Sequence, residues 1–221
     1  MVVVVAVDGN IGAGKSTVLA ALPFPVVQEP VHEWEPTLKR FYAAPDRWAF
    51  TLQCQVLASM ATMRTTIAAS DAPVVVVERS PVSARVFLRN LRERGSMDAL
   101  ELDVYQRLHD ALAWTPDATV FLKVPAAVCH RRVLTRGRVS EKTLPLRYLE
   151  DLERHYDTAM VAPGVTVVDG TGPTEQVVCA VTRAVQGFAA TRNNKKNPCS
   201  GRSCSVPGAS VEWRSPAPST S

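Results

Sequence analysis

Short runs of apolar, mostly β-branched residues alternate along the chain with longer segments in which apolar and polar positions recur at helical spacing. Continuous apolar runs of this kind are typical of parallel strands that are buried on both faces of a sheet. Five such runs predict strands over residues 2–7, 26–28, 74–77, 119–124 and 165–168. Because helical segments separate the strands, the order predicts an α/β fold, a five-stranded parallel sheet flanked by helices.

Proline and glycine residues mark the ends of the helical segments. The pattern predicts helices over residues 15–21, 46–69, 83–94, 98–114, 125–135, 145–160 and 174–189. All of these elements fall within residues 1–190, which we expect to form one domain. Residues 191–221 are rich in Ser, Pro and Asn and show no periodicity, and they predict a disordered tail.

The distribution of charge argues against a nucleic-acid partner. The chain has 25 basic and 21 acidic residues, a net charge of +4, and the tail alone holds five basic residues against one acidic residue. The remaining body is neutral and lacks the broad positive field that drives nonspecific nucleic-acid binding. We therefore expect no nucleic-acid partner.

Cysteine content and hydropathy bear on the compartment. The chain has five cysteines, an odd number, and we interpret them as reduced thiols of a cytoplasmic protein. The apolar start lacks the basic region of a signal peptide, and no apolar run is long enough to span a membrane. These features predict a cytoplasmic protein without a membrane partner.

The segment after the first predicted strand matches the phosphate-binding pattern G-x-x-x-x-G-K-[ST]. It lies between a strand and a helix, the context in which backbone N–H groups and the helix N-terminus bind phosphate. Lys15 can reach the β- and γ-phosphates of ATP, and the Ser16 hydroxyl can ligate Mg²⁺. The predicted ATP-binding residues of this loop are Gly9, Asn10, Ile11, Gly12, Ala13, Gly14, Lys15, Ser16 and Thr17.

Such a loop occurs in GTPases, in ATP-driven machines and in kinases. A GTPase carries an Asn-Lys-x-Asp motif after a later strand, and the similar string at residues 193–197 lacks the Asp and falls in the tail. A large ATPase requires a longer chain. The remaining class is a P-loop kinase, which needs a base for the acceptor hydroxyl and a metal ion beside the phosphates.

Two acidic residues and a group of arginines are candidates for the other roles. Glu29 and Glu78 each follow a predicted strand, at the edge of the sheet where ligands bind. Alternatively, they cap the following helices, or Glu78 pairs with Arg79. The arginines lie around Gly137 between two predicted helices and form either a basic lid that closes over phosphates or an ordinary solvated turn. They are Arg131, Arg132, Arg136 and Arg138.

Together these segments resemble the deoxynucleoside kinase family, which includes deoxycytidine, deoxyguanosine and thymidine kinases of cells and viruses. The matching strings occur in family order over about residues 3–160. They are the loop from Asp8 to Thr17, Glu29-Pro30-Val31 with Trp34, Pro45-Asp46-Arg47-Trp48, Glu78-Arg79-Ser80 with Ser83, Tyr105-Gln106, His109-Asp110, Arg136-Gly137-Arg138, Glu141 and Pro145-Leu146-Arg147-Tyr148-Leu149. The resemblance implies transfer of phosphate from ATP, with Mg²⁺, to the 5′-hydroxyl of a deoxynucleoside, and assembly as a homodimer.

The resemblance also implies a role for each matched residue. Glu29 corresponds to the base that accepts the 5′-hydroxyl proton, and Arg79 to the residue that holds the 5′-oxygen and the transferred phosphate. With Lys15 they form the expected catalytic set, and Glu78 joins Ser16 at Mg²⁺. The other matches are Tyr42 and Glu141 at the 3′-hydroxyl, Gln53 at the base edge, Arg132, Arg136 and Arg138 in the lid, and Trp34, Val56, Met60 and Ala84 around the base.

Several positions depart from the family pattern and bear on the substrate. Leu52 and Leu88 stand where the family usually has phenylalanines that sandwich the base, and Ser140 stands where it often has a second acid. Ala84 and Met60 stand where members that favour deoxycytidine and purines usually have an Asp and an Arg. We therefore expect thymidine to be preferred over deoxycytidine. The short chain and the unmatched tail suggest a viral member that acts in the host cytoplasm.

Two other functions stay open at this point. A thymidylate kinase shares the fold class but usually carries Asp-Arg-Tyr after the third strand, and some viral thymidine kinases perform both reactions. A non-catalytic nucleotide-binding regulator has no use for an acceptor base, so the presence of Lys15, Glu29 and Arg79 argues against it.

Overall fold

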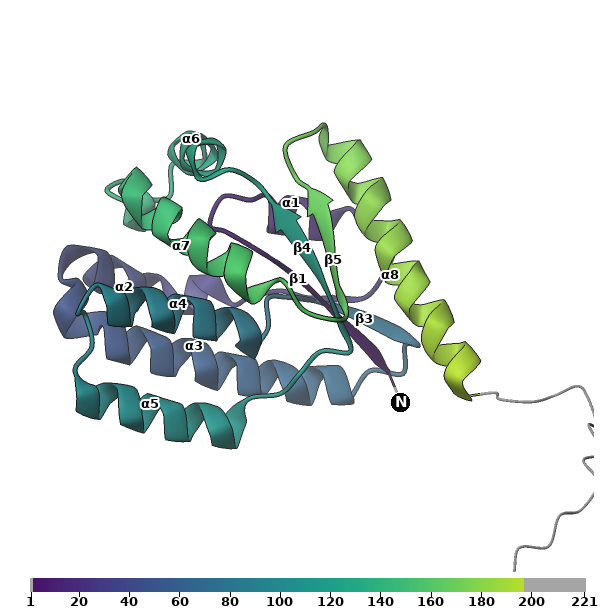
Figure 1. Cartoon of the computed structure of the whole chain (residues 1–221), viewed down its shortest axis with the longest axis horizontal. Helices are drawn as coiled ribbons and strands as arrows, with labels where there is room; N and C mark the ends of the chain where they lie inside the picture. The colour runs from purple at the N-terminus through teal and green to yellow at the C-terminus, as the bar shows by residue number, and fades with distance from the viewer. Residues whose placement is uncertain (1, 197–221) are drawn as a thin grey trace, which may run out of the picture.

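A computed structural model describes residues 2–196 and confirms the predicted α/β fold. Five parallel strands form one sheet in the order β2-β3-β1-β4-β5 (Figure 1). Because β1 pairs with both β3 and β4 and helices cover the sheet, its apolar run is almost entirely buried. The strands are β1 (Val3–Gly9), β2 (Val26–Val27), β3 (Val74–Glu78), β4 (Ala118–Lys123) and β5 (Val165–Asp169).

Helices cover both faces of this sheet (Figure 1). They are α1 (Lys15–Ala20), α2 (Val31–Ala43), α3 (Pro45–Ala68), α4 (Pro81–Glu93), α5 (Ala99–Leu112), α6 (Ala126–Arg136), the 3-10 helix η1 (Val139–Glu141), α7 (Leu146–Ala159) and α8 (Thr174–Lys196). On one face, α1 and α8 contact each other and β1. On the other side, α4 contacts both α3 and α7, α2 and α5 pack against α3, and α6 packs against α7.

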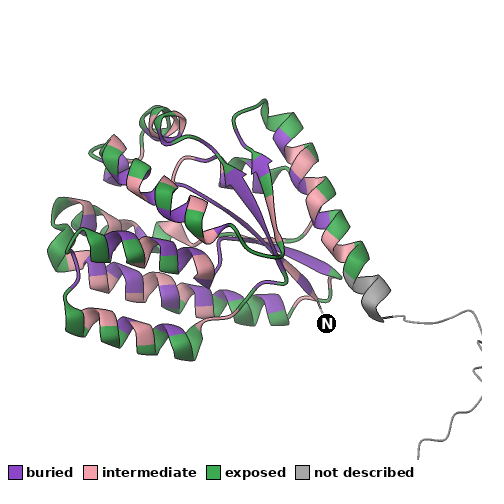
Figure 2. Ribbon diagram, in the orientation of Figure 1, coloured by how far each residue is buried: buried purple, intermediate pink, exposed green. Residues whose placement is uncertain are grey.

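The helices turn their apolar residues inward, as α8 illustrates (Figure 2). Its buried residues Val177, Val181 and Val185 recur every fourth position and so lie along one side of the helix. α8 continues to Lys196, beyond the predicted end at residue 189, so residues 191–196 of the predicted tail are helical. The rest of the predicted disordered tail, residues 197–221, lies outside the described residues.

Two elements, α2 and η1, were not predicted from the sequence. α2 contains Pro36, which lacks the backbone N–H that a helix interior uses, and this residue obscured the helical pattern. The buried side chains of Trp34 and Phe41 lie two turns apart in α2. Because both are covered by the rest of the molecule, packing stabilises the helix despite the proline.

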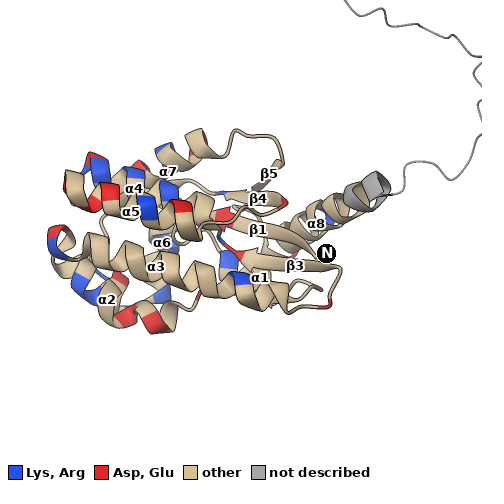
Figure 3. Cartoon of the chain, turned by 90° about the horizontal axis from the view of Figure 1, so that it is seen from below, with Lys and Arg blue, Asp and Glu red and all other residues tan. Residues whose placement is uncertain are grey.

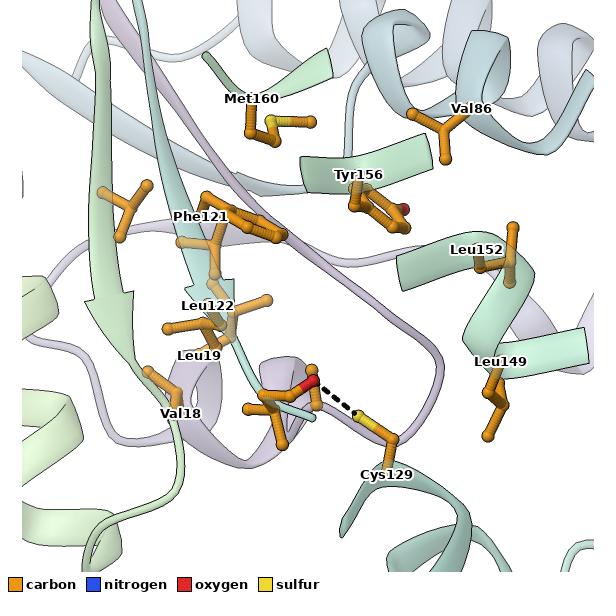
Figure 4. Close-up of a cluster of buried hydrophobic side chains, with 14 of the residues drawn as sticks. Val18, Leu19, Val86, Phe121, Leu122, Cys129, Leu149, Leu152, Tyr156 and Met160 are labelled. Carbon is orange, nitrogen blue, oxygen red and sulfur yellow. Dashed lines mark hydrogen bonds between the residues drawn. The ribbon is translucent and has the colours of Figure 1, made fainter. Parts of the chain in front are cut away.

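A buried aromatic pair joins β4 to α7 in the core (Figure 4). Phe121 and Tyr156 stack with their ring centroids 5.6 Å apart. Nearby, the buried Cys129 thiol donates a hydrogen bond to the carbonyl oxygen of Val124 at 3.6 Å. These contacts fix α7 and α6 relative to the carboxyl end of β4, which borders the phosphate loop.

The described part of the chain carries free cysteines and charged residues of both signs. Cys54, Cys129 and Cys179 are free thiols, and Cys199 and Cys204 lie outside the described residues. Basic and acidic residues are interspersed along the helices (Figure 3). Among the helices of residues 2–196, none combines the length and apolar character needed to cross a bilayer.

Candidate active site

The phosphate loop connects β1 to α1 and packs closely against α6. Gly12 has a φ of 80°, and a Cβ atom there would lie 2.5 Å from the Cys129 carbonyl oxygen and 2.9 Å from the Val133 side chain. A larger residue fits neither this left-handed backbone nor this approach. The glycine therefore lets α6 sit directly against the loop.

Two cavities adjoin the loop and share part of it as a common wall. The first cavity, about 230 Å³, is lined by the loop and by residues of α2, α3 and α4. The second cavity, about 610 Å³, is lined by the loop, α6 and the start of α8. Gly12, Gly14, Thr17 and Arg136 line both. Of the other predicted loop residues, Ile11, Lys15 and Ser16 line the first cavity, Ala13 lines the second, and Gly9 and Asn10 support Lys15.

Lys15 lies at the start of α1, and its ammonium group is held by the loop itself. Nζ donates hydrogen bonds to the carbonyl oxygens of Gly9 and Asn10, each at 3.0 Å. Burial and the neighbouring Arg79 guanidinium lower the pKa of Lys15 to about 8. Lys15 lines the first cavity. Because its ammonium group is buried and has lost its contact with water, an anionic group bound there would stabilise its charge.

Arg79 directly follows β3 and has a strained backbone. Its φ of 61° lies in the left-handed region, which a non-glycine residue adopts only when its surroundings force it. Ser80 and Ser83 then form a capping box that begins α4. This turn directs the buried guanidinium toward β2, where Nε donates to Glu29 Oε2 at 3.1 Å. Glu29, predicted at a strand end, thus forms an ion pair with Arg79, the residue that follows Glu78.

Glu29 is a buried carboxylate among charges of both signs. Burial raises its pKa to about 7, Arg79 and Lys15 oppose that rise, and Glu78 adds to it. A carboxylate with a pKa near neutrality changes protonation easily at physiological pH, as a general base requires. Glu29 does not cap the following helix, because the N-cap of α2 is Pro30 and no side chain makes a capping hydrogen bond there.

Ser16 and Glu78 meet at the end of the loop. The Ser16 hydroxyl donates to Glu78 Oε1 at 2.8 Å, and Glu78 is nearly buried. Within residues 2–196 no cluster of three or more His, Cys, Asp or Glu side chains is present. Mg²⁺ commonly binds through one or two protein oxygens together with substrate phosphates and water. One hydroxyl and one carboxylate beside the loop fit that ion.

The first cavity brings together every residue predicted for the acceptor. The predicted residues that line it are Glu29, Trp34, Tyr42, Gln53, Val56, Met60, Arg79, Ala84 and Glu141. Its walls are mainly apolar. The side-chain oxygen Oε1 of Gln53 is buried and has no hydrogen-bond partner among the described residues. A polar edge facing apolar walls suits the planar base of a nucleoside.

Other residues lining the first cavity were not predicted, and one expectation changes. Leu52 lines the cavity, whereas Leu88 does not, and Phe87 lines it instead. The Phe87 ring lies under Arg79, 4.9 Å from the guanidinium carbon. Tyr148 of α7 also reaches the cavity. The spacing of Phe87 four residues after Ser83, which also lines the cavity, is the signal in the sequence that could have revealed it.

The predicted lid arginines divide into two groups. Arg136 and Arg138 both donate to the buried carboxylate of Glu141, and the Arg138 contact is 3.4 Å long. Arg132 instead donates to the carbonyl oxygens of Ala13 at 3.0 Å and Gly170 at 2.9 Å. It therefore braces the phosphate loop rather than standing free in a lid.

The remaining lid residues lie at the edges of the site. Arg131 lines the second cavity, and Ser140 is buried beside Glu141. The two strand-end acids, the loop, the apolar cavity and the paired arginines are thus one continuous site.

Comparison with known proteins assigns the chain to a family. A family model described as deoxynucleoside kinase matches residues 5–186. The chain belongs to the deoxynucleoside kinase family. Its members phosphorylate deoxynucleosides, and the fold, the loop and the acceptor cavity of this deoxynucleoside kinase agree with that activity.

Relatives in this family come from viruses and from animals. A protein of Invertebrate iridescent virus 3 with a provisional kinase name, 029R, is 36% identical over 187 residues, which cover 83% of this chain and 96% of the relative. Deoxycytidine kinase of Homo sapiens is 32% identical over 189 residues, which cover 69% of this chain and 72% of the relative.

The fold also matches a solved kinase structure. The structure of deoxyadenosine kinase from M. mycoides, with the products dCMP and dCDP bound, matches with a TM-score of 0.75 at 20% sequence identity. The match covers 83% of this chain and 99% of that chain. It confirms the P-loop nucleoside kinase fold.

Proposed function

We propose that this deoxynucleoside kinase transfers the γ-phosphate of ATP to the 5′-hydroxyl of a pyrimidine deoxynucleoside, with thymidine preferred. The observation that carries this proposal is the Glu29–Arg79 pair in the cavity that Lys15 and Ser16 also line. The pair supplies a base and a cation where an acceptor hydroxyl must meet the terminal phosphate. A nucleotide-binding regulator needs neither.

The residues divide the work of phosphoryl transfer. As the bond between the 5′-oxygen and the γ-phosphorus forms and the bond to the ADP oxygen breaks, the hydroxyl proton passes to the Glu29 carboxylate. Arg79 and Lys15 neutralise charge on the transferred group and on the β-phosphate. Ser16 and Glu78 would hold Mg²⁺, which supplies further neutralisation of the phosphates. Arg136 and Arg138 come from the segment that would close over them.

The acceptor cavity favours thymine for reasons of polarity and shape. Val56, Met60 and Ala84 line it without a charged group, and Met60 and Ala84 are buried. They give apolar room to the 5-methyl group of thymine and offer no acceptor to an exocyclic amine. The unpartnered Gln53 oxygen can accept from N3–H, and its amide can donate to O4. A flipped amide could serve cytosine, which places deoxycytidine second.

A nucleoside panel scored by kcat/KM tests the preference. We expect thymidine first, deoxyuridine and deoxycytidine behind it, and purines poor. The double change Met60→Arg with Ala84→Asp places a charged acceptor in the cavity. A hydrogen bond to a charged group contributes about 1.5–3 kcal/mol, so the deoxycytidine-to-thymidine ratio should rise about tenfold or more.

Two results would contradict this assignment. They are a wild-type enzyme that prefers deoxycytidine or deoxyguanosine to thymidine, and a double variant with an unchanged ratio. Adding thymidylate to the panel tests whether a monophosphate is also accepted.

Assembly and location stay predictions that follow from the resemblance. We expect a homodimer in the host cytoplasm, with no nucleic-acid partner. Light scattering of the purified protein, with and without DNA, checks both the dimer and the absence of DNA binding.

A further inference from the structure

The Arg79 guanidinium contacts the acceptor cavity on one side, here called its front, through Nε, and the core on the other side, here called its back, through Nη1. On the front, Nε donates to Glu29 at 3.1 Å. On the back, Nη1 donates to the Gly9 carbonyl oxygen at 3.0 Å and to the hydroxyl oxygen of Tyr156. Arg79 also lines the first cavity, so part of its side chain is open to a ligand there. The contacts of Nη1 with Gly9 and Tyr156 therefore fix the orientation of the guanidinium relative to the cavity.

Tyr156 reaches this position from α7 through a well-packed ring. The ring stacks on Phe121 and meets the edge of Phe87 at a centroid distance of 6.4 Å (Figure 4). The side chain is fully buried and does not line the acceptor cavity. Its hydroxyl therefore contributes an oriented oxygen to Arg79 and nothing directly to a substrate.

Asp8 completes the back of the site from the end of β1. The residue is completely buried, and its Oδ1 accepts from the Gly9 backbone N–H at 2.8 Å and lies 3.6 Å from Arg79 Nη1. Its Oδ2 has no hydrogen-bond partner among the described residues. A buried carboxylate is costly unless a cation compensates it, and Arg79 is the cation in contact. Asp8 also acts electrostatically on the Tyr156 hydroxyl.

We propose that Asp8 and Tyr156 are positioning residues that hold Nη1 of the Arg79 guanidinium on the side of the core, so that the Nε edge stays beside Glu29, where the acceptor oxygen and the transferred phosphate meet. This inference rests on the proposed role of Arg79 in phosphoryl transfer. Neither residue lines the first cavity, and Arg79 is the group in that cavity that both of them contact.

This role predicts a selective effect on turnover. Gln53, Glu141 and the apolar walls of the acceptor cavity contact the nucleoside whether or not Arg79 is held, so nucleoside binding should be retained. The charge on the transferred group develops only during the reaction, and a loosely held guanidinium stabilises it less well. Loss of the back contacts should therefore lower kcat and leave KM nearly unchanged.

The test is Tyr156→Phe, which removes only the hydroxyl and keeps the ring that packs on Phe121. We expect kcat to fall about tenfold and both KM values to change by less than about twofold. The matched control is Tyr105→Phe, since Tyr105 is also fully buried and its hydroxyl has no partner among the described residues. Tyr105→Phe should leave kcat unchanged, and the melting temperatures of both variants should be similar.

A second variant, Asp8→Asn, removes the charge but keeps the shape. If both residues act through Arg79, the double variant should lose little more kcat than the single variant with the larger loss. An unchanged kcat in Tyr156→Phe, losses that multiply in the double variant, or KM values that rise as much as kcat falls would each overturn the inference. A failure of the proposed function would give a different result from a failure of this inference. In that case the turnover of the wild-type enzyme would not depend on Glu29.

Discussion

Among residues 2–196, Arg79 is the single non-glycine residue with a left-handed backbone, and it lines the first cavity, which we propose binds the acceptor. A backbone of this kind costs of order 1–3 kcal/mol and persists only when surrounding contacts enforce it. The contacts with Glu29, Gly9 and Tyr156 supply that enforcement. At the residue scale, the site thus contains a strained turn at Arg79 that is held by Glu29 on one side and by Gly9 and Tyr156 on the other.

Glu29→Gln tests the base at this scale. The amide keeps the shape of the side chain but cannot accept the 5′-hydroxyl proton. General-base loss lowers turnover by about 10²–10⁴-fold, and we expect kcat with thymidine to fall within that range. Nucleoside and ATP binding, measured by calorimetry, should be largely retained. A decrease of less than about fivefold would show that another group takes the proton.

The dependence of kcat/KM on pH should be bell-shaped. Burial raises the pKa of Glu29 to about 7, so below that pH the carboxyl is protonated and kcat/KM falls about tenfold per pH unit. Burial lowers the pKa of Lys15 to about 8, so above that pH the ammonium loses its charge and kcat/KM declines again. Glu29→Gln should abolish the acidic limb. A wild-type acidic limb near pH 4.5, the ordinary pKa of Glu, would contradict the assignment.

At the scale of elements, the contact between the phosphate loop and α6 is the feature most exposed to mutation. Gly12→Ala places a methyl group against the Cys129 carbonyl oxygen and strains the left-handed backbone. The loop or α6 must move, so the free energy of unfolding should fall by about 1–3 kcal/mol and the KM for ATP should rise.

Gly95→Ala is the matched control, because Gly95 has a φ of 69° and no atom lies within 4 Å of its added methyl group. It carries the backbone strain alone and should leave the KM for ATP unchanged. If both variants raise the KM equally, the contact with α6 is not what shapes the loop. Thermal melts and steady-state kinetics on both variants provide the comparison.

The sequence predicted elements well where burial leaves a simple pattern. All five strands were found because each is a short run of mainly apolar residues, and β1 and β3, which are buried on both faces, consist almost entirely of them. α2 was missed because Pro36 obscures a helix that forms through the packing of Trp34 and Phe41. The end of α8 was placed too early because residues 190–196 carry no apolar pattern.

The site was predictable only in part, because tertiary packing decides which side chains reach it. Glu29 and Glu78 were expected at strand ends because parallel strands bring their carboxyl ends to one edge of the sheet. The choice of Phe87 over Leu88 at the cavity depends on how α4 is rotated, which tertiary packing decides. The contacts of Arg132 with two carbonyl oxygens are likewise invisible in the sequence, since they join segments far apart in the chain.

At the scale of the whole molecule, the contacts of α8 with the core end at Ala189, well before the end of the helix at Lys196. Truncation after Lys196 removes none of the buried residues Val177, Val181 and Val185. We expect the free energy of unfolding to change by less than about 0.5 kcal/mol and turnover to stay the same.

Truncation after Arg183 is the comparison, because it removes Val185 and should destabilise the protein by about 2 kcal/mol or more. Urea denaturation curves measure both effects. A large loss of stability or turnover in the longer truncated protein would show that residues 197–221 interact with the kinase domain.

The central position of β1 has a consequence for how the protein is made. β1 leaves the ribosome first, yet Val5 pairs with Val76 on one side and with Ala118 on the other. At about 5–20 residues per second, the second partner follows roughly 5–20 seconds later. During that interval a strand of nearly continuous valine has an unpaired edge. The nascent chain is therefore most prone to aggregation before β4 emerges, and chaperone binding to the N-terminal segment should matter most then.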